Sequence, residues 1–287
     1  MKPVESGQAA PACYVRFAMR SLSPEERLDA AIQAPVGREL HRPDTRVVRR
    51  DGWLQVITPS ASRGLLNEVT FSRLTSGEAD RVIEETIAEY RAAGQPTKWY
   101  VGPWSEPSDL GDRLARRGFS RVDGRGMGCP TDRVLAPVPG VVVEEIGEAT
   151  LEPYLTTAIA AWSMGDDQLE AERLAHRAAL AAAPRTAWFF GARLGDEMVG
   201  TAGIFGRDRS GYLVGGVVLP HARGRGVYRA LVAARLAFLD ARGVSYAVTH
   251  AREATSAPRL EHLGFETLFR SAYWRLDLEP AAPSDAV

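Results

Sequence analysis

The sequence predicts an α+β protein, an α/β-type sandwich in which helices flank a mixed, mostly antiparallel sheet. Short runs of β-branched and aromatic residues alternate with stretches of helical periodicity along the chain. Three consecutive strand-like runs, at 187–194, 197–207 and 211–219, are separated only by short turns, as expected for an antiparallel meander. Hydrophobic residues make up 45% and charged residues 25% of the chain, the balance of an ordinary globular protein.

A proline-rich segment near the middle predicts a boundary between two domains. Pro130, Pro137 and Pro139 follow closely after Cys129, and proline disfavours both helix and central strand. The 287 residues are long for one compact domain and suffice for two of about 140 residues each. We therefore predict one domain at 1–138 and a second at 139–287.

Both halves alternate between helix and strand patterns. In the first half, Ser23 and Pro24 predict a helix start, because serine caps and proline suits the first turn. The patterns that follow predict strands at 52–58, 67–74 and 98–101, helices at 76–93 and 109–116, and a strand after Phe119. Besides the meander, the second half predicts strands at 141–146, 244–250 and 266–278 and helices at 150–162, 168–182, 226–242 and 256–263.

Charge, cysteine content and hydropathy narrow the class of protein. A net charge of −1 and a pI near 6.6 argue against a dedicated binder of nucleic acid, which needs a basic excess. Two cysteines are too few for a disulfide framework. No apolar run reaches the ~18 residues of a membrane span, and charged residues interrupt the N-terminus where a secretory signal would be apolar. We expect a cytoplasmic protein without membrane or nucleic-acid partners.

The residues from 223 to 229 carry the clearest chemical signal. A buried strand ends just before them and a long helix begins within them, so unpaired N–H groups and the helix dipole favour a bound phosphate there. Gly224 and Gly226 allow the backbone to approach an anion closely. Three arginines surround the glycines: Arg223, Arg225 and Arg229.

This run resembles motif A of the GNAT acetyltransferases, whose core is Arg/Gln-x-x-Gly-x-Gly/Ala. Arg223 takes the first place and Gly226 the central glycine, whereas Tyr228 replaces the last small residue. The resemblance covers about 141–278 and implies a GNAT fold that uses acetyl-CoA as acyl donor and no metal. The acyl-CoA-binding residues that it implies are Val217, Val218, Leu219, Arg223, Gly224, Arg225, Gly226, Val227, Tyr228 and Arg229.

Two of the family's usual catalytic groups are absent from the matching positions. The helix at 257–265 usually carries a tyrosine that protonates the departing thiolate, and Leu260 stands there in this chain. The strand at 211–219 has no carboxylate to serve as a base. Catalysis then depends on other groups, or mainly on holding the amine near the thioester.

His250 and Tyr228 are the candidates for proton transfer. An imidazole is a general proton carrier near neutral pH, and His250 ends a strand near the expected substrate entrance. Tyr228 opens the helix beside the cofactor loop and is either an acid or a packing ring. His262, Glu253 and His221 are weaker candidates. His262 and Glu253 are also explained as solvated surface residues, and His221 precedes the loop and could simply border the phosphate site.

The first half carries a weaker form of the same resemblance. Leu114 with Gly118-Phe119 repeats the closure found at 260–265, which favours a degenerate tandem repeat. In place of the glycine loop stand residues 73–78, where Glu78 would repel a pyrophosphate. The resemblance therefore implies a non-catalytic, GNAT-like N-terminal half.

Two further clusters have two interpretations each. Trp99, Tyr100 and Trp104 line a ligand pocket or form ordinary core. Asp166 and Asp167 hold a cationic amine or are a solvated loop.

The leading functional hypothesis is an N-acetyltransferase that moves an acetyl group from acetyl-CoA to a primary amine of a small molecule. A non-catalytic acyl-CoA-binding sensor or interaction module is the alternative from another class. A third is a GNAT-fold enzyme with another acyl donor or with a carrier- or tRNA-bound substrate. A homodimer is compatible with each.

Overall fold

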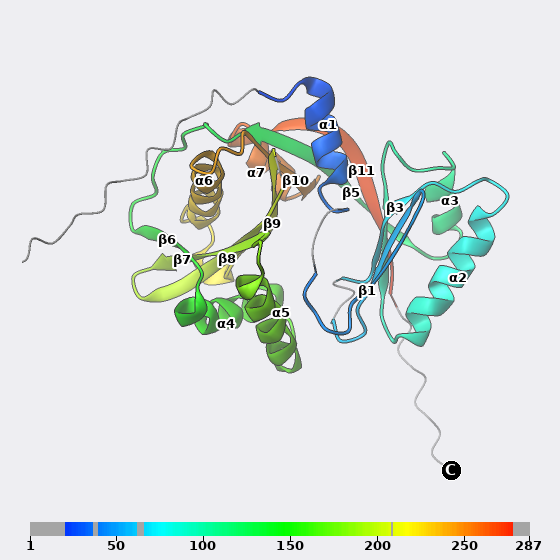
Figure 1. The fold of residues 1–287 in the computed structure, drawn as a ribbon, viewed down its shortest axis with the longest axis horizontal. Coiled ribbons are helices and arrows are strands. Elements are labelled where there is room, and N and C mark those ends of the chain that lie inside the picture. The colour runs from blue at the N-terminus through cyan, green and yellow to red at the C-terminus, as the bar shows by residue number, and fades with distance from the viewer. Residues whose placement is uncertain (1–20, 37–39, 62–65, 208, 278–287) are drawn as a thin grey trace, which may run out of the picture.

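The computed structural model describes residues 21–36, 40–61, 66–207 and 209–277. Within them, 11 strands form one continuous sheet in the order β1-β2-β3-β4-β11-β5-β10-β9-β8-β7-β6. Neighbouring strands are antiparallel except for β3 with β4 and β9 with β10. The predicted class is therefore confirmed: helices flank a mixed, mostly antiparallel sheet (Figure 1).

The first half follows the predicted order, with one addition. Its elements are α1 (Pro24–Gln33), β1 (Arg46–Arg50), β2 (Trp53–Ile57), β3 (Glu68–Ser72), α2 (Ala79–Ala92), β4 (Thr97–Val101), α3 (Leu110–Ala115) and β5 (Ser120–Pro130). Strand β1 was not predicted, because its largely exposed sequence Arg-Val-Val-Arg-Arg has no buried apolar face. It exists through its ladder with β2, at the edge of the sheet.

The second half contains the predicted helices and the predicted meander. Its elements are β6 (Val141–Glu145), α4 (Leu151–Trp162), α5 (Leu169–Ala181), β7 (Ala187–Leu194), β8 (Glu197–Gly206), β9 (Ser210–Val218), α6 (Val227–Asp240), β10 (Tyr246–Arg252), α7 (Ser256–His262) and β11 (Glu266–Leu276). Short 3-10 turns lie at Glu148–Thr150, Asp166–Gln168 and Pro220–Ala222. The proline-rich segment 131–140 is neither helix nor strand.

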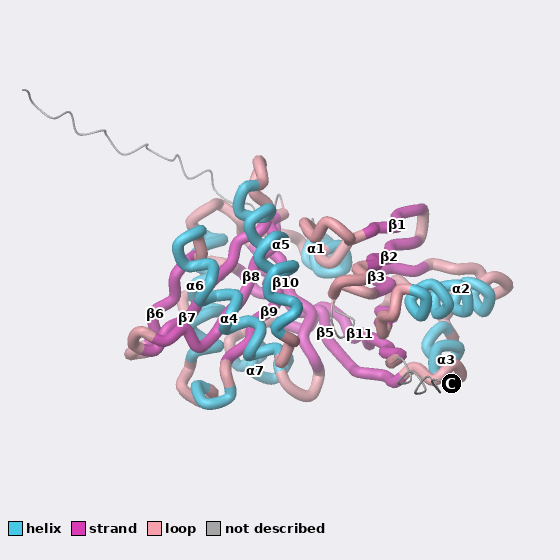
Figure 2. The backbone as a smooth tube through the Cα atoms, turned by 90° about the horizontal axis from the view of Figure 1, so that it is seen from below, coloured by secondary structure: helices cyan, strands magenta, loops and turns pink. Residues whose placement is uncertain are grey.

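The last strands of the two halves are exchanged. Strand β5, from the first half, pairs with β10 of the second, and β11, the closing strand of the chain, pairs with β4 of the first. Strands β5 and β11 also pair with each other and run side by side through the middle of the molecule (Figure 2). Because β5 and β11 each pair with a strand of the other half, one sheet is continuous across both halves. The division of the chain at 138/139 stays a prediction.

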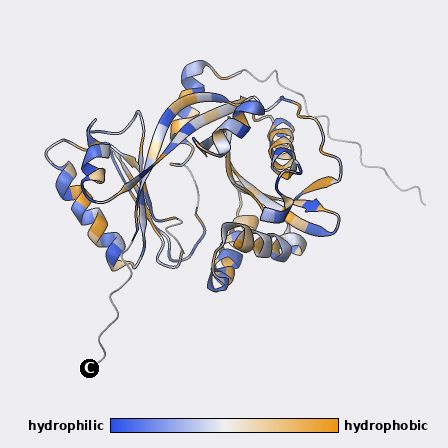
Figure 3. Cartoon of the chain, turned by 180° about the vertical axis from the view of Figure 1, so that it is seen from behind, coloured by the Kyte–Doolittle hydropathy of each residue, from blue (hydrophilic) through white to orange (hydrophobic). Residues whose placement is uncertain are grey.

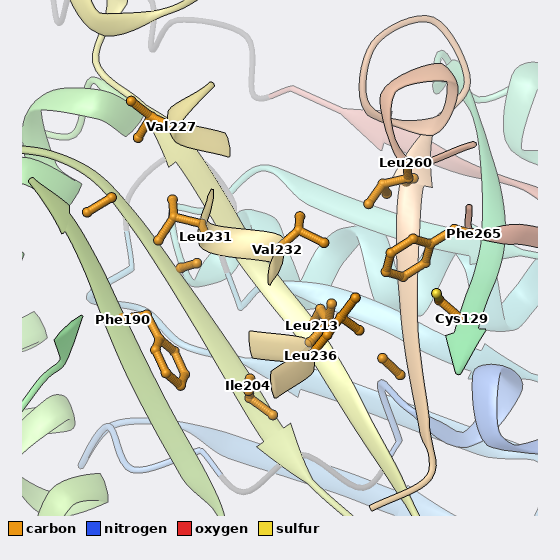
Figure 4. Close-up of a cluster of buried hydrophobic side chains, with 14 of the residues drawn as sticks. Cys129, Phe190, Ile204, Leu213, Val227, Leu231, Val232, Leu236, Leu260 and Phe265 are labelled. Carbon is orange, nitrogen blue, oxygen red and sulfur yellow. The ribbon is translucent and has the colours of Figure 1, made fainter. Parts of the chain in front are cut away.

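Helices cover both faces of the second half. In Figure 1, α6 lies on one side of β7–β9 and α4 on the other. Apolar residues of α6 pack against the sheet and against α7 in a buried cluster that Figure 4 shows. Its labelled members are Cys129, Phe190, Ile204, Leu213, Val227, Leu231, Val232, Leu236, Leu260 and Phe265. At ~25 cal/mol per Å² of buried apolar surface, this cluster is a main source of stability for the half.

The helix α2 shows how the amphipathic pattern becomes structure. Its residues Val82, Ile83, Ile87 and Tyr90 are buried on one side, whereas charged residues occupy the other. Hydrophobic and hydrophilic residues are accordingly mixed along the helix (Figure 3).

The start of α1 confirms the predicted Ser23 cap. Ser23 Oγ accepts a hydrogen bond from the Glu26 amide at 3.2 Å, and Glu26 Oε2 accepts one from the Ser23 amide at 2.7 Å. Ala31 of the helix and its C-cap residue Ala34 belong to the same buried cluster as Phe269 of β11 and Tyr246 and Val248 of β10. The cap and this packing place the C-terminal carbonyls of α1 beside the second half of the sheet.

No helix within the described parts of the chain is long and apolar enough to cross a membrane.

Candidate active site

The site forms where β9 and β10 part. Their parallel ladder joins Tyr246 to Ser210 and ends with Val248 opposite Tyr212. Beyond it, the Thr249 hydroxyl donates to the Leu213 carbonyl at 2.9 Å. The strands then separate around a cavity of about 840 Å³. This volume lies within the usual range of ligand sites.

A β-bulge turns the backbone of β9 beside this cavity. Thr201 of β8 pairs with Val217, but Gly203 pairs with Val214, so Gly215 and Gly216 lie opposite one residue of β8. Gly215 has a φ of +61°, which favours glycine. A bulge of this kind interrupts the ladder and redirects the strand. Gly215 and Gly216, the two residues of the bulge, line the cavity.

Arg235 lies under the bulge and was not foreseen from the sequence. The side chain comes from the apolar face of α6, is 2% exposed, and donates through Nη1 to the carbonyls of Gly203 and Val214, both at 3.3 Å. Burial lowers the pKa of Arg235 to about 10, so the guanidinium stays charged at neutral pH. The available signal was an arginine between Leu231 and Leu236 on a face that is otherwise apolar.

The N-terminus of α6 is open to an anion. Gly224 and Gly226 have φ values of +77° and +80°, and Gly226 is the N-cap residue. No described side chain caps this helix end, so its first amides keep their capacity to donate. Arg229 lines the cavity, and its Nε atom is buried without a hydrogen-bond partner among the described residues. The glycines, the free amides and this uncommitted guanidinium fit a phosphate group.

Most of the predicted cofactor residues meet around the cavity, although Leu219 and Arg225 do not line it. The Leu219 amide donates to the Val199 carbonyl at 2.8 Å, so this N–H faces β8. The Arg223 Nε atom donates to the Val218 carbonyl at 3.2 Å and holds the loop against the end of β9. The predicted residues that line the cavity are Val217, Val218, Arg223, Gly224, Gly226, Val227, Tyr228 and Arg229.

Both predicted proton-transfer residues line the same cavity. The Tyr228 ring lies so close to β9 that a Cβ atom on Gly216 would be 3.0 Å from Tyr228 Cε2. Burial raises the pKa of Tyr228, so the phenol keeps its proton at neutral pH. His250 donates through Nε2 to the Ala31 carbonyl at 2.9 Å, because a carbonyl can only accept. Its protonated Nε2 leaves Nδ1 as the basic nitrogen of the neutral ring.

Of the weaker candidates for proton transfer, His262 lines the cavity and His221 does not. His262 and Leu260 line the cavity, Leu260 being buried there. His221 instead pairs with Glu197 at 3.2 Å, where both side chains are exposed, and does not line it.

Glu253 is paired with arginines instead of being a solvated loop residue. It binds Arg125 of β5 and Arg270 of β11, and the hydrogen bond from Arg125 lowers the pKa of Glu253 to about 2. A carboxylate so acidic is a poor base at neutral pH. It also lies outside the cavity between β9 and β10.

The aromatic cluster of the first half is packing. Trp99 is fully buried and donates through Nε1 to Ser72 Oγ at 3.0 Å. Trp104 packs edge-on against Phe269 of β11, with ring centroids 5.2 Å apart. Neither tryptophan lines the cavity, so the interpretation as core holds. Asp166 and Asp167 also lie outside the cavity, and unlike the tryptophans they are exposed.

Comparisons with known proteins identify the family and the fold. Residues 148–265 match the model of the acetyltransferase (GNAT) family. A comparison with curated proteins finds no match. Within the described residues, His, Cys, Asp and Glu side chains form no group of three or more that could hold a metal ion.

Solved structures of GNAT proteins resemble almost the whole chain. A GCN5-related N-acetyltransferase from Kribbella flavida superposes with a TM-score of 0.62 at 14% identity and covers 88% of this chain and 95% of its own. One from Sphaerobacter thermophilus has a TM-score of 0.59 at 18% identity, with 92% and 96% covered. A tandem GNAT protein from the clavulanic acid biosynthesis pathway has a TM-score of 0.55 at 16% identity, with 90% and 96% covered.

The fold is thus that of GNAT N-acetyltransferases, and residues 148–265 form an acetyltransferase domain of that family.

Proposed function

We propose that this protein transfers an acetyl group from acetyl-CoA to a primary amine of a small molecule. The observation that carries the proposal is that one cavity combines two features. These are an uncapped, glycine-flanked N-terminus of α6 and a gap between β9 and β10 beside the bulge. The first suits a pyrophosphate, and the second admits an extended arm that leads to the acyl group.

The donor is held by backbone and arginine groups. The amides after Gly226 and the guanidinium of Arg229 bind the pyrophosphate, with Arg223 bracing the loop. Backbone groups of Val217 and Val218, at the end of β9, pair with the pantetheine arm. Their position beyond the bulge, where β10 no longer pairs with β9, supports this role.

The chemistry is direct attack. The amine nitrogen forms a bond to the thioester carbonyl carbon, the C–S bond breaks, and the thiolate leaves with the bonding electrons. Amides of the bulge stabilise the negative charge that develops on the carbonyl oxygen. His250, through Nδ1, or water accepts the proton that the amine loses. Tyr228, protonated at neutral pH, is the donor to the thiolate in place of the phenol that Leu260 lacks.

Two measurements test the proposal. Acetyl-CoA is titrated calorimetrically into the protein, and the release of CoA thiol is followed with a panel of primary amines. Micromolar binding together with amine-dependent release supports it. Absence of binding contradicts the whole assignment of the cavity.

The alternative is an acyl-CoA-binding sensor, which is favoured by the buried Leu260 at the usual place of the acid. It predicts acetyl-CoA binding without CoA release for any amine. Enzymes with another acyl donor or with a carrier- or tRNA-bound acceptor would instead turn over only when that donor or acceptor is supplied.

The first half, in this proposal, is a non-catalytic GNAT-like domain. Its strands support the sheet behind the cavity, since β5 pairs with β10 along the whole of that strand.

A further inference from the structure

The cavity between β9 and β10 is lined by cations and by no anion. Among the described residues that line it there is no aspartate or glutamate. Its basic side chains are Arg223, Arg229, Arg235, Arg252, Arg259, His250 and His262. A cavity of this charge repels an ammonium group and attracts anions.

The acyl donor accounts for only part of this charge. Arg223 lies in the loop before α6 and Arg229 in the first turn of that helix, where the pyrophosphate is expected. Arg259, on α7, is near enough to Tyr228 at that helix end to act on its phenol electrostatically. Arg235 is bound to backbone carbonyls under the bulge. Arg252 is left without a role.

Arg252 lies on the face of β10 opposite the α6 and α7 packing. Ala251 belongs to the buried cluster under those helices, and successive side chains of a strand point to opposite faces. His250 and Arg252 therefore share the other face, where the His250 ring contacts Tyr212 and Phe269. The Arg252 side chain is exposed and forms no hydrogen bond or ion pair with the described residues.

We propose that the amine acceptor also carries an anionic group, a carboxylate or phosphonate, which Arg252 binds while the amine lies at His250. This inference rests on the proposed function and names its substrate class. The guanidinium fork matches such groups in a bidentate way. Residues two apart on a strand are separated by about 6.6–6.8 Å, so an acceptor with a few carbons between its amine and its anion spans the pair.

The same charge also favours the reactive form of the amine. Nearby cations lower the pKa of an ammonium, which increases the fraction of neutral, nucleophilic amine. The basic side chains of the cavity would repel an acceptor whose only charged group is an ammonium. They attract an acceptor that also has an anionic group, and that attraction holds the amine nitrogen in the cavity without a carboxylate among the described lining residues.

The test compares matched acceptors. CoA release is measured for γ-aminobutyrate, 3-aminopropylphosphonate and n-butylamine, in the natural protein and in the Arg252→Gln, Arg252→Lys and Arg91→Gln variants. Arg91 is exposed on α2 and serves as the charge-matched control. We expect kcat/KM for n-butylamine to be about tenfold or more below that of an anionic amine.

The variants separate this role from a structural one. Arg252→Gln should remove the preference through KM of the acceptor and leave KM of acetyl-CoA unchanged. Arg252→Lys should restore part of it, and Arg91→Gln should behave like the natural protein. Equal use of n-butylamine and γ-aminobutyrate, or a preference that survives Arg252→Gln, would overturn the inference.

Failure of the proposed function would look different. If no amine releases CoA, binding of γ-aminobutyrate and 3-aminopropylphosphonate is titrated into the protein saturated with CoA. Binding that Arg252→Gln abolishes supports the anion site even without turnover. No binding of either anion to this complex overturns it.

Discussion

The two halves build the same junction and use it differently. In each, a strand runs into a helix and pairs in parallel with the strand after that helix: β3 with β4 through α2, and β9 with β10 through α6. In the second half the pair opens into the cavity. In the first, Glu106 lies along the end of β3, its amide donating to the Ser72 carbonyl at 3.3 Å and its carbonyl accepting from Leu74 at 3.0 Å.

The starts of α2 and α6 differ in which groups contact the backbone amides there. Before α2, Glu78 Oε1 accepts from the Thr75 amide and Thr75 Oγ1 accepts from the Glu78 amide, both at 3.3 Å. Side chains of the turn that leads into α2 thus bind the backbone amides of that turn. Before α6, Gly224 and Gly226 leave the amides open. A few residues therefore distinguish the two helix starts: Thr75 and Glu78 before α2, and Gly224 and Gly226 before α6.

The largest expected effect concerns the segment that fills the first junction. Trp104→Ala removes a buried ring that packs on Phe71 and Phe269, and we expect it to cost about 3–5 kcal/mol of unfolding free energy. Trp162→Ala is the control, since that ring is 41% exposed. Urea unfolding of both variants checks this. A similar loss in both would show that Trp104 has no special part in closing the junction.

The next prediction concerns the open junction. Gly224→Glu should weaken acetyl-CoA binding by about 100-fold, because it places a negative charge at the helix end. Gly224→Ala carries the same backbone strain at φ +77° without the charge and should lose much less. Calorimetric titration of both variants measures the difference. If alanine and glutamate weaken binding equally, strain and not phosphate recognition explains the loss.

Arg235→Met tests the support under the bulge, which has no counterpart in the sequence of α2. It removes the hydrogen bonds that Arg235 donates to the carbonyls of Gly203 and Val214, so we expect a loss of about 2 kcal/mol in stability. Turnover should also fall if the bulge presents its amides to the thioester. Denaturant unfolding and kcat are measured together. Unchanged values of both would contradict the assigned role.

Thr75→Ala removes the hydroxyl that accepts from the Glu78 amide in the turn before α2 and should cost about 1 kcal/mol, as for a capping side chain. Affinity for acetyl-CoA should stay the same, since α2 lies in the other half. Thermal unfolding and titration give both numbers. A gain or loss of acetyl-CoA affinity would mean that the first junction also takes part in binding.

The smallest effect is a pH dependence at the joint between the halves. Glu253 joins β5 and β11 through Arg125 and Arg270, and its pKa is lowered from 4.5 to about 2. Its contribution to stability is therefore complete above pH 4.5 and is lost as the pH falls through about 2. Glu253→Gln should flatten the pH profile of stability in that window only. An effect near neutral pH would point to another role.

The features that the sequence predicted correctly depend on residues that are close together in the chain. The meander, α4 to α7 and the glycine loop before α6 all depend on neighbouring residues: turns, caps, periodicity and the φ preferences of glycine. The first junction was likewise predicted to be unsuited to a phosphate, from its single glycine and Glu78, and the hydrogen bonds between Glu78 and Thr75 are a local feature of the same kind.

What the sequence could not supply depends on contacts between distant residues. The exposed strand β1 exists through its partner β2. The bulge became visible only when β8 and β9 were paired, and with it the reason for a buried Arg235.

The sequence by itself therefore determined most of the elements, their order and the glycine loop before α6, because backbone conformation follows local side-chain chemistry. Tertiary structure decided the exchange of β5 and β11, the opening between β9 and β10, and the sharing of one strand face by His250 and Arg252. Register and strand order arise from burial against residues far along the chain, which no local pattern specifies.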